Sequence, residues 1–228
     1  WSCWPRSESH GSLRVRPEDD QAIKHLASVS RETLSTLELY ARNLAKWSKA
    51  INLVASGDRE SLWSRHILDS AQLAAWLGRD EIGSWCDLGS GGGLPGLVVA
   101  IIAREVRPDV VVTLIESDAR KAAFLRMQVA ELSLSARVIA QRIETAERQR
   151  ADVVSARALA PLTALLNLAI RHAKPGSTFL FPKGRSYEDE VLAARKEFDF
   201  DLVTHASRSD PNGAILEIRS LEHSRPER

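Results

Sequence analysis

The sequence predicts an α/β protein: a doubly wound, mostly parallel sheet with an antiparallel last strand, preceded by an N-terminal helical cap. Three observations predict it. Apolar residues recur at helical spacing before residue 80, short apolar runs then alternate with helical segments, and two closely spaced apolar runs end the chain. With 228 residues, 44% hydrophobic and 27% charged, the chain has an ordinary globular composition and can bury a core without a disulfide framework.

Residues 17–80 are expected to form the helical cap. One helical face there carries Leu34, Leu37, Ala41, Leu44 and Ile51, which are three, four or seven residues apart. A second helical pattern covers residues 60–77, and a Ser-Gly-Asp turn signal at 56–58 separates the two. Residues 1–16 follow neither pattern, and we expect a disordered or non-native tail there.

Residues 81–228 are expected to form the sheet domain. The apolar runs predict strands at 84–88, 110–115, 137–141, 152–155 and 178–181. The segments between them predict helices at 95–104, 119–132, 161–172 and 187–198. Because helices separate the strands, the sheet should be parallel. The last two runs, 202–207 and 214–221, are joined by Ser-Asp-Pro-Asn-Gly, which predicts a hairpin and an antiparallel last strand.

A glycine-rich turn follows the first predicted strand. Residues 85–96 read Trp-Cys-Asp-Leu-Gly-Ser-Gly-Gly-Gly-Leu-Pro-Gly, at the edge where an open parallel sheet binds its ligand. The spacing Gly91-x-Gly93-x-x-Gly96 matches the dinucleotide fingerprint. However, Asp87 precedes the first glycine by two residues, and its carboxylate would repel a pyrophosphate but attract an ammonium or sulfonium group. The turn alone therefore leaves two ligand classes open.

Residues after the next two strands favour the cationic ligand. Glu116 ends the second strand, where a carboxylate can accept hydrogen bonds from both ribose hydroxyls. Ile143 and Glu144 follow the third strand, where an adenine ring would lie. Asp87, the glycines and these three residues together predict a pocket for an adenosine with a cationic amino-acid arm, which is S-adenosylmethionine.

Absent residues restrict the methyl acceptor. Amine methyltransferases commonly have Asn/Asp-Pro-Pro-aromatic after the fourth strand, where this chain has Ser155-Ala156-Arg157-Ala158. A cysteine nucleophile is also not expected, because Cys86 lies within the first strand and Cys3 in the tail. The possibility that remains is direct attack of a purine ring nitrogen on the cofactor's methyl group. Guanine N7 carries no proton, so we assign no general base and no catalytic residue. The sequence contains no clustered Cys/His set, and we expect no metal site.

Positive charge is concentrated between Arg137 and Arg185. This segment contains nine basic and three acidic residues, although the whole chain has a net charge of only +1. A basic rim around the ligand edge suits a phosphate backbone. We therefore predict RNA contacts for Arg142, Arg157 and Lys183. Arg65, His66 and Asp69 are interpreted as an intrahelical pair or a link to the following domain in preference to RNA contacts.

Several motifs resemble the GidB/RsmG family. Residues 46–53, Lys-Trp-Ser-Lys-Ala-Ile-Asn-Leu, are similar to its Lys-Trp-Asn-Lys-x-x-Asn-Leu, and residues 65–70 repeat its Arg-His-x-x-Asp-Ser. The turn at 87–96 follows its Asp-x-Gly-Ser/Thr-Gly-x-Gly-Phe/Leu-Pro-Gly, and the likeness extends from about residue 44 to 184.

This resemblance implies a Rossmann-like class I methyltransferase fold and methylation of guanine N7 in 16S ribosomal RNA with S-adenosylmethionine. By position, the family's cofactor contacts fall on Gly89, Leu94, Ile143, Glu144 and Arg157. With the residues argued above, the expected cofactor site comprises Asp87, Gly89, Gly91, Leu94, Glu116, Ile143, Glu144 and Arg157.

The expected partner is 16S ribosomal RNA or the small ribosomal subunit, bound by a monomer. No apolar run reaches the ~20 residues of a membrane span, so no membrane is expected. Only two cysteines occur, which favours the reducing cytoplasm. Two alternatives remain open: an NAD-dependent oxidoreductase, from the glycine spacing, and a non-catalytic RNA-binding assembly factor on a methyltransferase scaffold.

Overall fold

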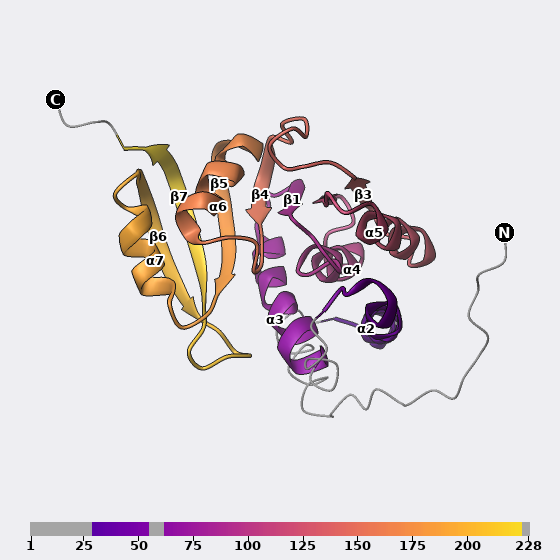
Figure 1. The fold of residues 1–228 in the computed structure, drawn as a ribbon. Helices are drawn as coiled ribbons and strands as arrows, with labels where there is room; N and C mark the ends of the chain where they lie inside the picture. The colour runs from indigo at the N-terminus through magenta and orange to yellow at the C-terminus, as the bar shows by residue number, and fades with distance from the viewer. Residues whose placement is uncertain (1–28, 55–61, 225–228) are drawn as a thin grey trace.

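The computed structural model describes residues 29–54 and 62–224 (Figure 1). They form a seven-stranded sheet in the order β3-β2-β1-β4-β5-β7-β6. The tail predicted for residues 1–16, the first part of the cap and the turn predicted at 56–58 lie outside the described residues. No helix within the described part of the chain is both long and apolar enough to cross a membrane.

The sheet is parallel except for one strand. Its strands are β1 (Ser84–Leu88), β2 (Val111–Ile115), β3 (Ala136–Ile139), β4 (Ala151–Ser155), β5 (Ala173–Lys183), β6 (Phe198–Ala206) and β7 (Ala214–His223). The first five pair in parallel, whereas β7 is antiparallel to both β5 and β6. The predicted sheet with an antiparallel last strand is therefore confirmed. The carboxyl ends of β1, β2 and β4 lie side by side, which places their following loops together.

Helices cover both faces of the sheet (Figure 1). They are α4 (Gly96–Val106), α5 (Ala119–Glu131), α6 (Leu162–Ala169) and α7 (Tyr187–Ala194). Successive residues of one strand enter opposite cores: Trp85 packs with the α4 and α5 side, and Cys86 with the α6 and α7 side. This alternation is the period of two that a strand buried on both faces requires.

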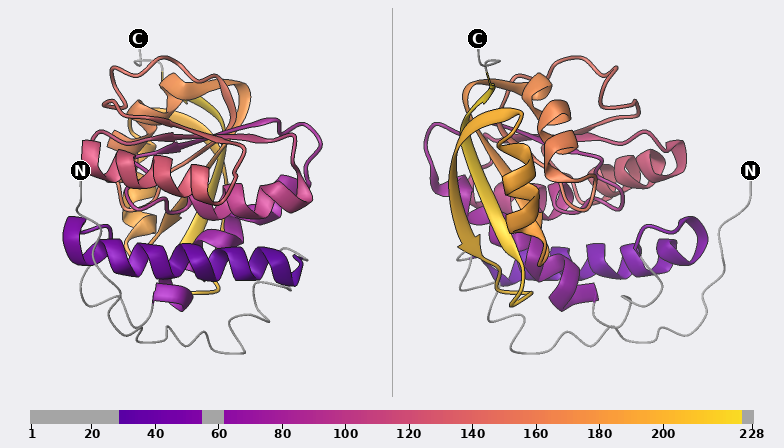
Figure 2. Two further views of the ribbon diagram at one scale, coloured as in Figure 1. Left: turned by 90° about the vertical axis from the view of Figure 1, so that its right-hand side faces the viewer. Right: turned by 60° about the vertical axis from the view of Figure 1, so that its left-hand side comes forward.

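The first helix of the cap within the described residues is α2 (Arg31–Ile51), whose N-cap residue, Ser30, accepts the Thr33 N–H with its hydroxyl. Figure 2 shows α2 running along the α4 and α5 side of the sheet. Its predicted apolar face is buried at Leu34, Leu37, Ala41 and Leu44 and partly buried at Ile51. On the same face, the Tyr40 hydroxyl donates to the Gly92 carbonyl at 2.7 Å, so the cap contacts the glycine-rich turn directly.

The cap's second helical segment is irregular. Its described part includes a π-helix, η2 (Trp63–Ile67), then a short α-helix, α3 (Leu68–Ala71), and a 3-10 helix, η3 (Gln72–Gly78). Apolar spacing predicted a helix here, and it could not predict which helical hydrogen-bond pattern would form. π-helical turns occur frequently at functional sites. This one includes Arg65 and His66.

One ionic cluster ties the cap to the last hairpin. The carboxylate of Glu217 on β7, only 3% exposed, accepts hydrogen bonds from Arg79 at 2.9 Å, Arg219 at 2.7 Å and His205 at 2.8 Å. Burial alone would raise the pKa of Glu217, but these hydrogen bonds outweigh burial and lower it to about 2. The cluster therefore holds β6, β7 and the end of the cap together.

Three predicted boundaries were wrong by four or five residues. The helix expected to reach residue 198 ends at Ala194, and β6 begins at Phe198 instead of residue 202. Phe198 and Phe200 are buried while Asp199 and Asp201 are exposed, which is the alternation of a strand. The helix predicted from the sequence includes the first of these residues, Phe198. Strand β5 also begins five residues earlier than predicted, at Ala173, where its first residues are mostly exposed and give no apolar signal.

Candidate active site

The turn between β1 and α4 depends on residues without a Cβ atom. Gly89, Gly91 and Gly93 have φ values of 62°, 56° and 96°, which glycine adopts without the steric cost of other residues. A Cβ on Gly96 would lie 2.3 Å from Leu114 and 2.7 Å from the Asp87 carboxylate. The glycines therefore allow both the left-handed backbone and the close packing of α4 on β1 and β2.

Glu116 closes this turn from the neighbouring strand. It directly follows β2, and its carboxylate accepts the Gly91 N–H at 2.8 Å and the Asp118 N–H at 2.7 Å, one on each oxygen. A carboxylate oxygen has two lone-pair directions, so each oxygen retains one. Glu116 is thus fixed in place while it can still accept hydrogen bonds from a ligand.

A pocket of about 390 Å³ opens over the turn, and we call it the turn pocket. Five of the predicted cofactor residues line it: Gly89, Gly91, Glu116, Ile143 and Glu144. Arg142, predicted for RNA, also lines it, together with Lys121. The carboxyl ends of β1, β2 and β3 thus bring together residues that are up to 55 positions apart in the sequence.

Asp87 and Leu94 lie beneath the turn instead. Asp87 is fully buried, and its carboxylate accepts the Ser155 hydroxyl at 2.7 Å and the Gly96 N–H at 3.2 Å. Burial raises the pKa of Asp87 to about 6, against the opposing effect of these hydrogen bonds. Leu94 is 6% exposed and belongs to the core. Both residues shape the turn, and neither lines the turn pocket.

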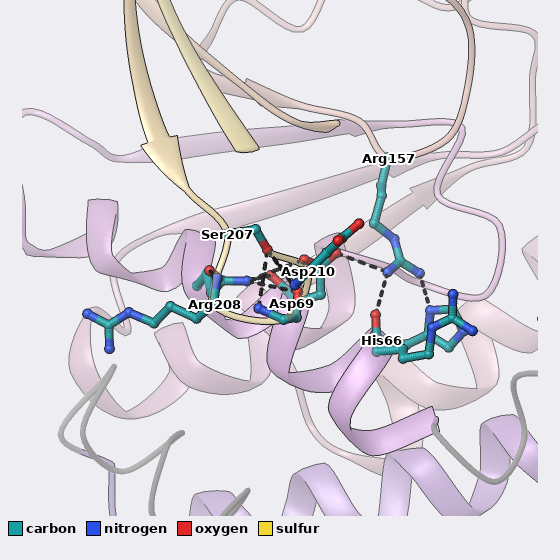
Figure 3. Close-up of polar contacts among 9 residues, drawn as sticks. His66, Asp69, Arg157, Ser207, Arg208 and Asp210 are labelled. Carbon is teal, nitrogen blue, oxygen red and sulfur yellow. Dashed lines mark hydrogen bonds and ion pairs between the residues drawn. The ribbon is translucent and has the colours of Figure 1, made fainter. Parts of the chain in front are cut away.

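Arg157 reaches the cap. Its Nη1 donates to Asp69 Oδ2 at 3.2 Å and to the Arg65 carbonyl at 3.3 Å, and its Nη2 donates to His66 Nδ1 at 2.8 Å (Figure 3). Arginine has no acceptor, so Nδ1 of His66 accepts this hydrogen bond. Of the two interpretations of Arg65, His66 and Asp69, an intrahelical pair or a link to the following domain, these contacts favour the link.

A second pocket, of about 720 Å³, lies beside Arg157, and we call it the hairpin pocket. Its lining comes from the cap, the loop after β4, the end of β5, α7 and the β6–β7 loop: Arg65, His66, Asp69, residues 157–161, residues 182–184, Glu190, Ser207, Ser209, Asp210, Pro211, Gly213 and Ala214. Lys183 contributes through an ammonium that donates to the Ala160 carbonyl and to Glu190 at 2.8 and 2.7 Å. Ala158 and Leu159 line both pockets, so a single loop separates them.

The β6–β7 loop is the part of the site that the sequence did not reveal. Ser209 donates to Asp69 Oδ1 at 2.6 Å, and the Arg208 N–H donates to Gln72 at 2.7 Å (Figure 3). The sequence showed only a turn there. No group of three or more His, Cys, Asp or Glu side chains is placed to hold a metal ion within residues 29–54 and 62–224.

The family model described as "GidB: rRNA small subunit methyltransferase G" matches residues 33–213. A protein of Cereibacter sphaeroides is 48% identical over 207 residues, which cover 90% of this chain and 99% of that protein. A protein of Paracoccus denitrificans is 48% identical over 198 residues, covering 86% of this chain and all of that protein. Both are named "Ribosomal RNA small subunit methyltransferase G".

Solved structures share the fold at low sequence identity. Cofactor-bound Rv0187 from MTB superposes with a TM-score of 0.56 at 15% identity, covering 90% of this chain and 98% of that one. A SAM dependent methyltransferase from Aquifex aeolicus gives 0.54 at 13% identity, covering 78% and 97%. The chain therefore shares its fold with both proteins. The sequence match to residues 33–213 shows that the chain belongs to the GidB family, rRNA small subunit methyltransferase G.

Proposed function

We propose that this chain transfers a methyl group from S-adenosylmethionine to N7 of a guanine in 16S ribosomal RNA. The observation that carries the proposal is the Glu116 carboxylate. It closes the glycine turn and retains lone pairs toward a pocket next to a second, larger pocket. Membership of the GidB family supports ribosomal RNA of the small subunit as the substrate.

The residues of the turn pocket fit this cofactor. Its volume of about 390 Å³ lies within the usual range of small-molecule sites, about 300–1,000 Å³. Glu116 would accept the ribose hydroxyls, Ile143 would pack against the adenine ring, and Gly91 would let the backbone approach the methionine arm. Asp87 would favour the cofactor's positive charge from beneath the turn, because it lies in a low-dielectric interior.

The chemistry requires little from the protein beyond placement. When bound, S-adenosylmethionine supplies a methyl group on a positively charged sulfur, which the N7 lone pair can take while the sulfur keeps the electron pair of the broken bond. N7 loses no proton, so no side chain must act as a base. The chain's residues would hold the two reactants in line and exclude water. Such positioning can supply a large share of the reduction in the activation free energy of a two-reactant step. We therefore assign no catalytic residue.

Positive charge around both pockets suits the RNA backbone. Arg142 is exposed at the turn pocket, and Lys183 at the hairpin pocket has a third ammonium hydrogen beyond its bonds to Ala160 and Glu190. Both would bind phosphates. We further propose that the chain acts as a monomer in the cytoplasm, on 16S ribosomal RNA or on the small subunit, without a membrane.

Neither of the two alternative functions, an NAD-dependent oxidoreductase and a non-catalytic RNA-binding factor, is supported. A dinucleotide would place its pyrophosphate at the turn, directly above the buried Asp87 carboxylate, where like charges repel. A non-catalytic RNA-binding factor would not need the Glu116 carboxylate held by Gly91 and Asp118 and directed to a pocket.

Transfer of a tritiated methyl group tests the proposal. The chain is incubated with labelled cofactor and with either free 16S ribosomal RNA or small subunits from a strain that lacks the modification, and the labelled base is mapped. Label at a guanine N7 is expected. Label at another atom, or no label on either substrate with a chain that binds the cofactor, would contradict it.

A further inference from the structure

The hairpin pocket adjoins the turn pocket at the ligand edge of the sheet. It lies beyond the carboxyl ends of β4 and β5, and it shares Ala158 and Leu159 with the turn pocket. Its volume of about 720 Å³ falls within the range of ligand sites. A methyl acceptor must reach the cofactor, and the hairpin pocket borders the turn pocket at the loop of Ala158 and Leu159.

Three carboxylates line the hairpin pocket, and two of them are engaged. Asp69 accepts from Ser209 and Gln72 on Oδ1 and from Arg157 on Oδ2. Glu190 accepts the Leu162 N–H and Lys183 on Oε2 and the Ser186 hydroxyl on Oε1. Both carboxylates therefore hold the walls of the pocket together.

Asp210 is the third carboxylate and differs from both. It lies in the β6–β7 loop, is exposed, and accepts the Asn212 N–H on Oδ1 at 2.9 Å. Its Oδ2 accepts no hydrogen bond within the described residues. Asp210 thus has spare acceptor capacity at the pocket wall, and it forms no ion pair with any described residue.

The hydrogen-bonding edges of guanine suit a pocket that borders the cofactor site and has a carboxylate in its lining. N7 lies on one edge of the purine, and the N1–H and N2–H₂ donors lie on the opposite edge. When N7 faces the turn pocket beside Ala158 and Leu159, the donor edge faces into the hairpin pocket, whose lining includes Asp210. A carboxylate can accept from N1–H and N2–H₂ together, a match that adenine lacks, because adenine presents an acceptor at N1.

We propose that the hairpin pocket binds the target guanine and that Asp210 determines its specificity by accepting from N1–H and N2–H₂. This inference rests on the proposed function, since it names the site of that reaction's substrate. Asp69 and Gln72 are positioning residues: they bind Ser209 and the Arg208 backbone, and so hold the loop that carries Asp210 against the cap (Figure 3).

Asp210→Asn tests the role of Asp210. The substitution keeps the Oδ1 acceptor used by Asn212 but allows an NH₂ group to replace the second oxygen, which opposes the guanine donors. We expect kcat/KM for ribosomal RNA to fall about 10- to 100-fold, as for loss of hydrogen bonds to a charged group. The dissociation constant of S-adenosylhomocysteine should stay within twofold. Asp199→Asn, an exposed carboxylate on β6 outside both pockets, is the matched control and should leave kcat/KM unchanged.

A second measurement separates recognition from a structural effect. Small-subunit RNA carrying inosine at the target position lacks only the N2 amino group of guanine. The unsubstituted chain should prefer guanine over inosine by at least about tenfold, and Asp210→Asn should lose that preference. A variant that only loosened the loop would methylate both RNAs more slowly and keep the ratio, which would overturn the inference.

The remaining outcomes are also decisive. If guanine N7 is methylated but Asp210→Asn leaves both kcat/KM and the guanine preference unchanged, the inference is wrong and the proposed function stands. If Asp210→Asn weakens cofactor binding, the pocket belongs to the cofactor and the inference is again wrong. If the unsubstituted chain methylates no small-subunit RNA, the proposed function fails and the inference fails with it.

Discussion

The two pockets are built in different ways, although they share a wall. The turn pocket consists largely of three segments that each follow a parallel strand, and its backbone is shaped by glycines within eight positions of one another. The hairpin pocket joins the cap, the loop after β4, the end of β5 and the β6–β7 loop, which span residues 65 to 214. A turn that requires positive φ values can be recognised in the sequence by its glycines. The packing of loops that are distant in the sequence has no such local pattern.

The largest expected effect is confined to the turn pocket. Gly91 has a φ of 56°, and the nearest atom to an added Cβ is the Gly89 carbonyl oxygen at 3.8 Å. Gly91→Val should therefore fold but strain the turn, since a β-branched residue rarely adopts this φ. We expect S-adenosylhomocysteine to bind about 100-fold more weakly by isothermal titration calorimetry. Gly78→Ala, which has open space around it and lies outside both pockets, should bind normally. If Gly91→Val and Gly78→Ala bind S-adenosylhomocysteine with equal affinity, the conformation of the turn does not determine cofactor binding.

The next largest effect concerns the stability of the β6–β7 hairpin, whose loop lines the hairpin pocket. The pKa of Glu217 is lowered from 4.5 to about 2, so its stabilising contribution is present above pH 4.5 and is lost as the pH falls from 4.5 toward 2. By urea unfolding, Glu217→Gln should be about 2 kcal/mol less stable than the unsubstituted chain at pH 7, and this difference should shrink at pH 3. A difference that stays constant between the two pH values would mean that ionisation of Glu217 is not its cause.

Glu116→Ala should act on the turn pocket through the ligand and through Gly91. It removes the acceptor for ribose hydroxyls and leaves the Gly91 N–H without its partner. We expect cofactor affinity to fall about tenfold, the effect of lost hydrogen bonds to a carboxylate. Glu116→Gln keeps one oxygen acceptor and should recover part of this loss. Full affinity in both variants would contradict the pocket described.

The smallest effect tests whether the two pockets are independent. Asp69→Asn weakens the bonds to Arg157 and Ser209, so KM for ribosomal RNA should rise about fivefold. Cofactor affinity should not change, and Asp80→Asn, an exposed carboxylate of the same cap, should alter neither quantity. Weaker cofactor binding in Asp69→Asn would show that Arg157 transmits the change through Ala158 and Leu159 to the turn pocket.

Periodicity predicted most of the fold, and its errors have physical causes. The seven strands and their alternation with helices followed from apolar runs, because each element buries one face or both. Phe198 was misassigned because a short helix and the start of an edge strand both place large apolar residues inside. The π-helical turn at Trp63–Ile67 could not be predicted, since its hydrogen-bond pattern depends on tertiary contacts.

The candidate site divides in the same way. Gly89, Gly91, Glu116, Ile143 and Glu144 were predicted from their positions after strands, and all of them line the turn pocket. Asp87 was assigned to the ligand by its charge, and only burial distinguishes a residue beneath a turn from one on its surface. Asp210 could not be selected from the sequence at all. Its importance depends on the docking of its loop by Asp69 and Gln72.

The Tyr40 hydroxyl bond to the Gly92 carbonyl has a practical consequence for anyone who divides the chain. A fragment cut near residue 80 would carry every strand, yet it would expose the underside of α4 and deprive a buried carbonyl of its donor. The amino-terminal helices are thus needed for the stability of the sheet domain. Grafting the sheet onto another protein would require a hydroxyl donor for the Gly92 carbonyl in the position of Tyr40.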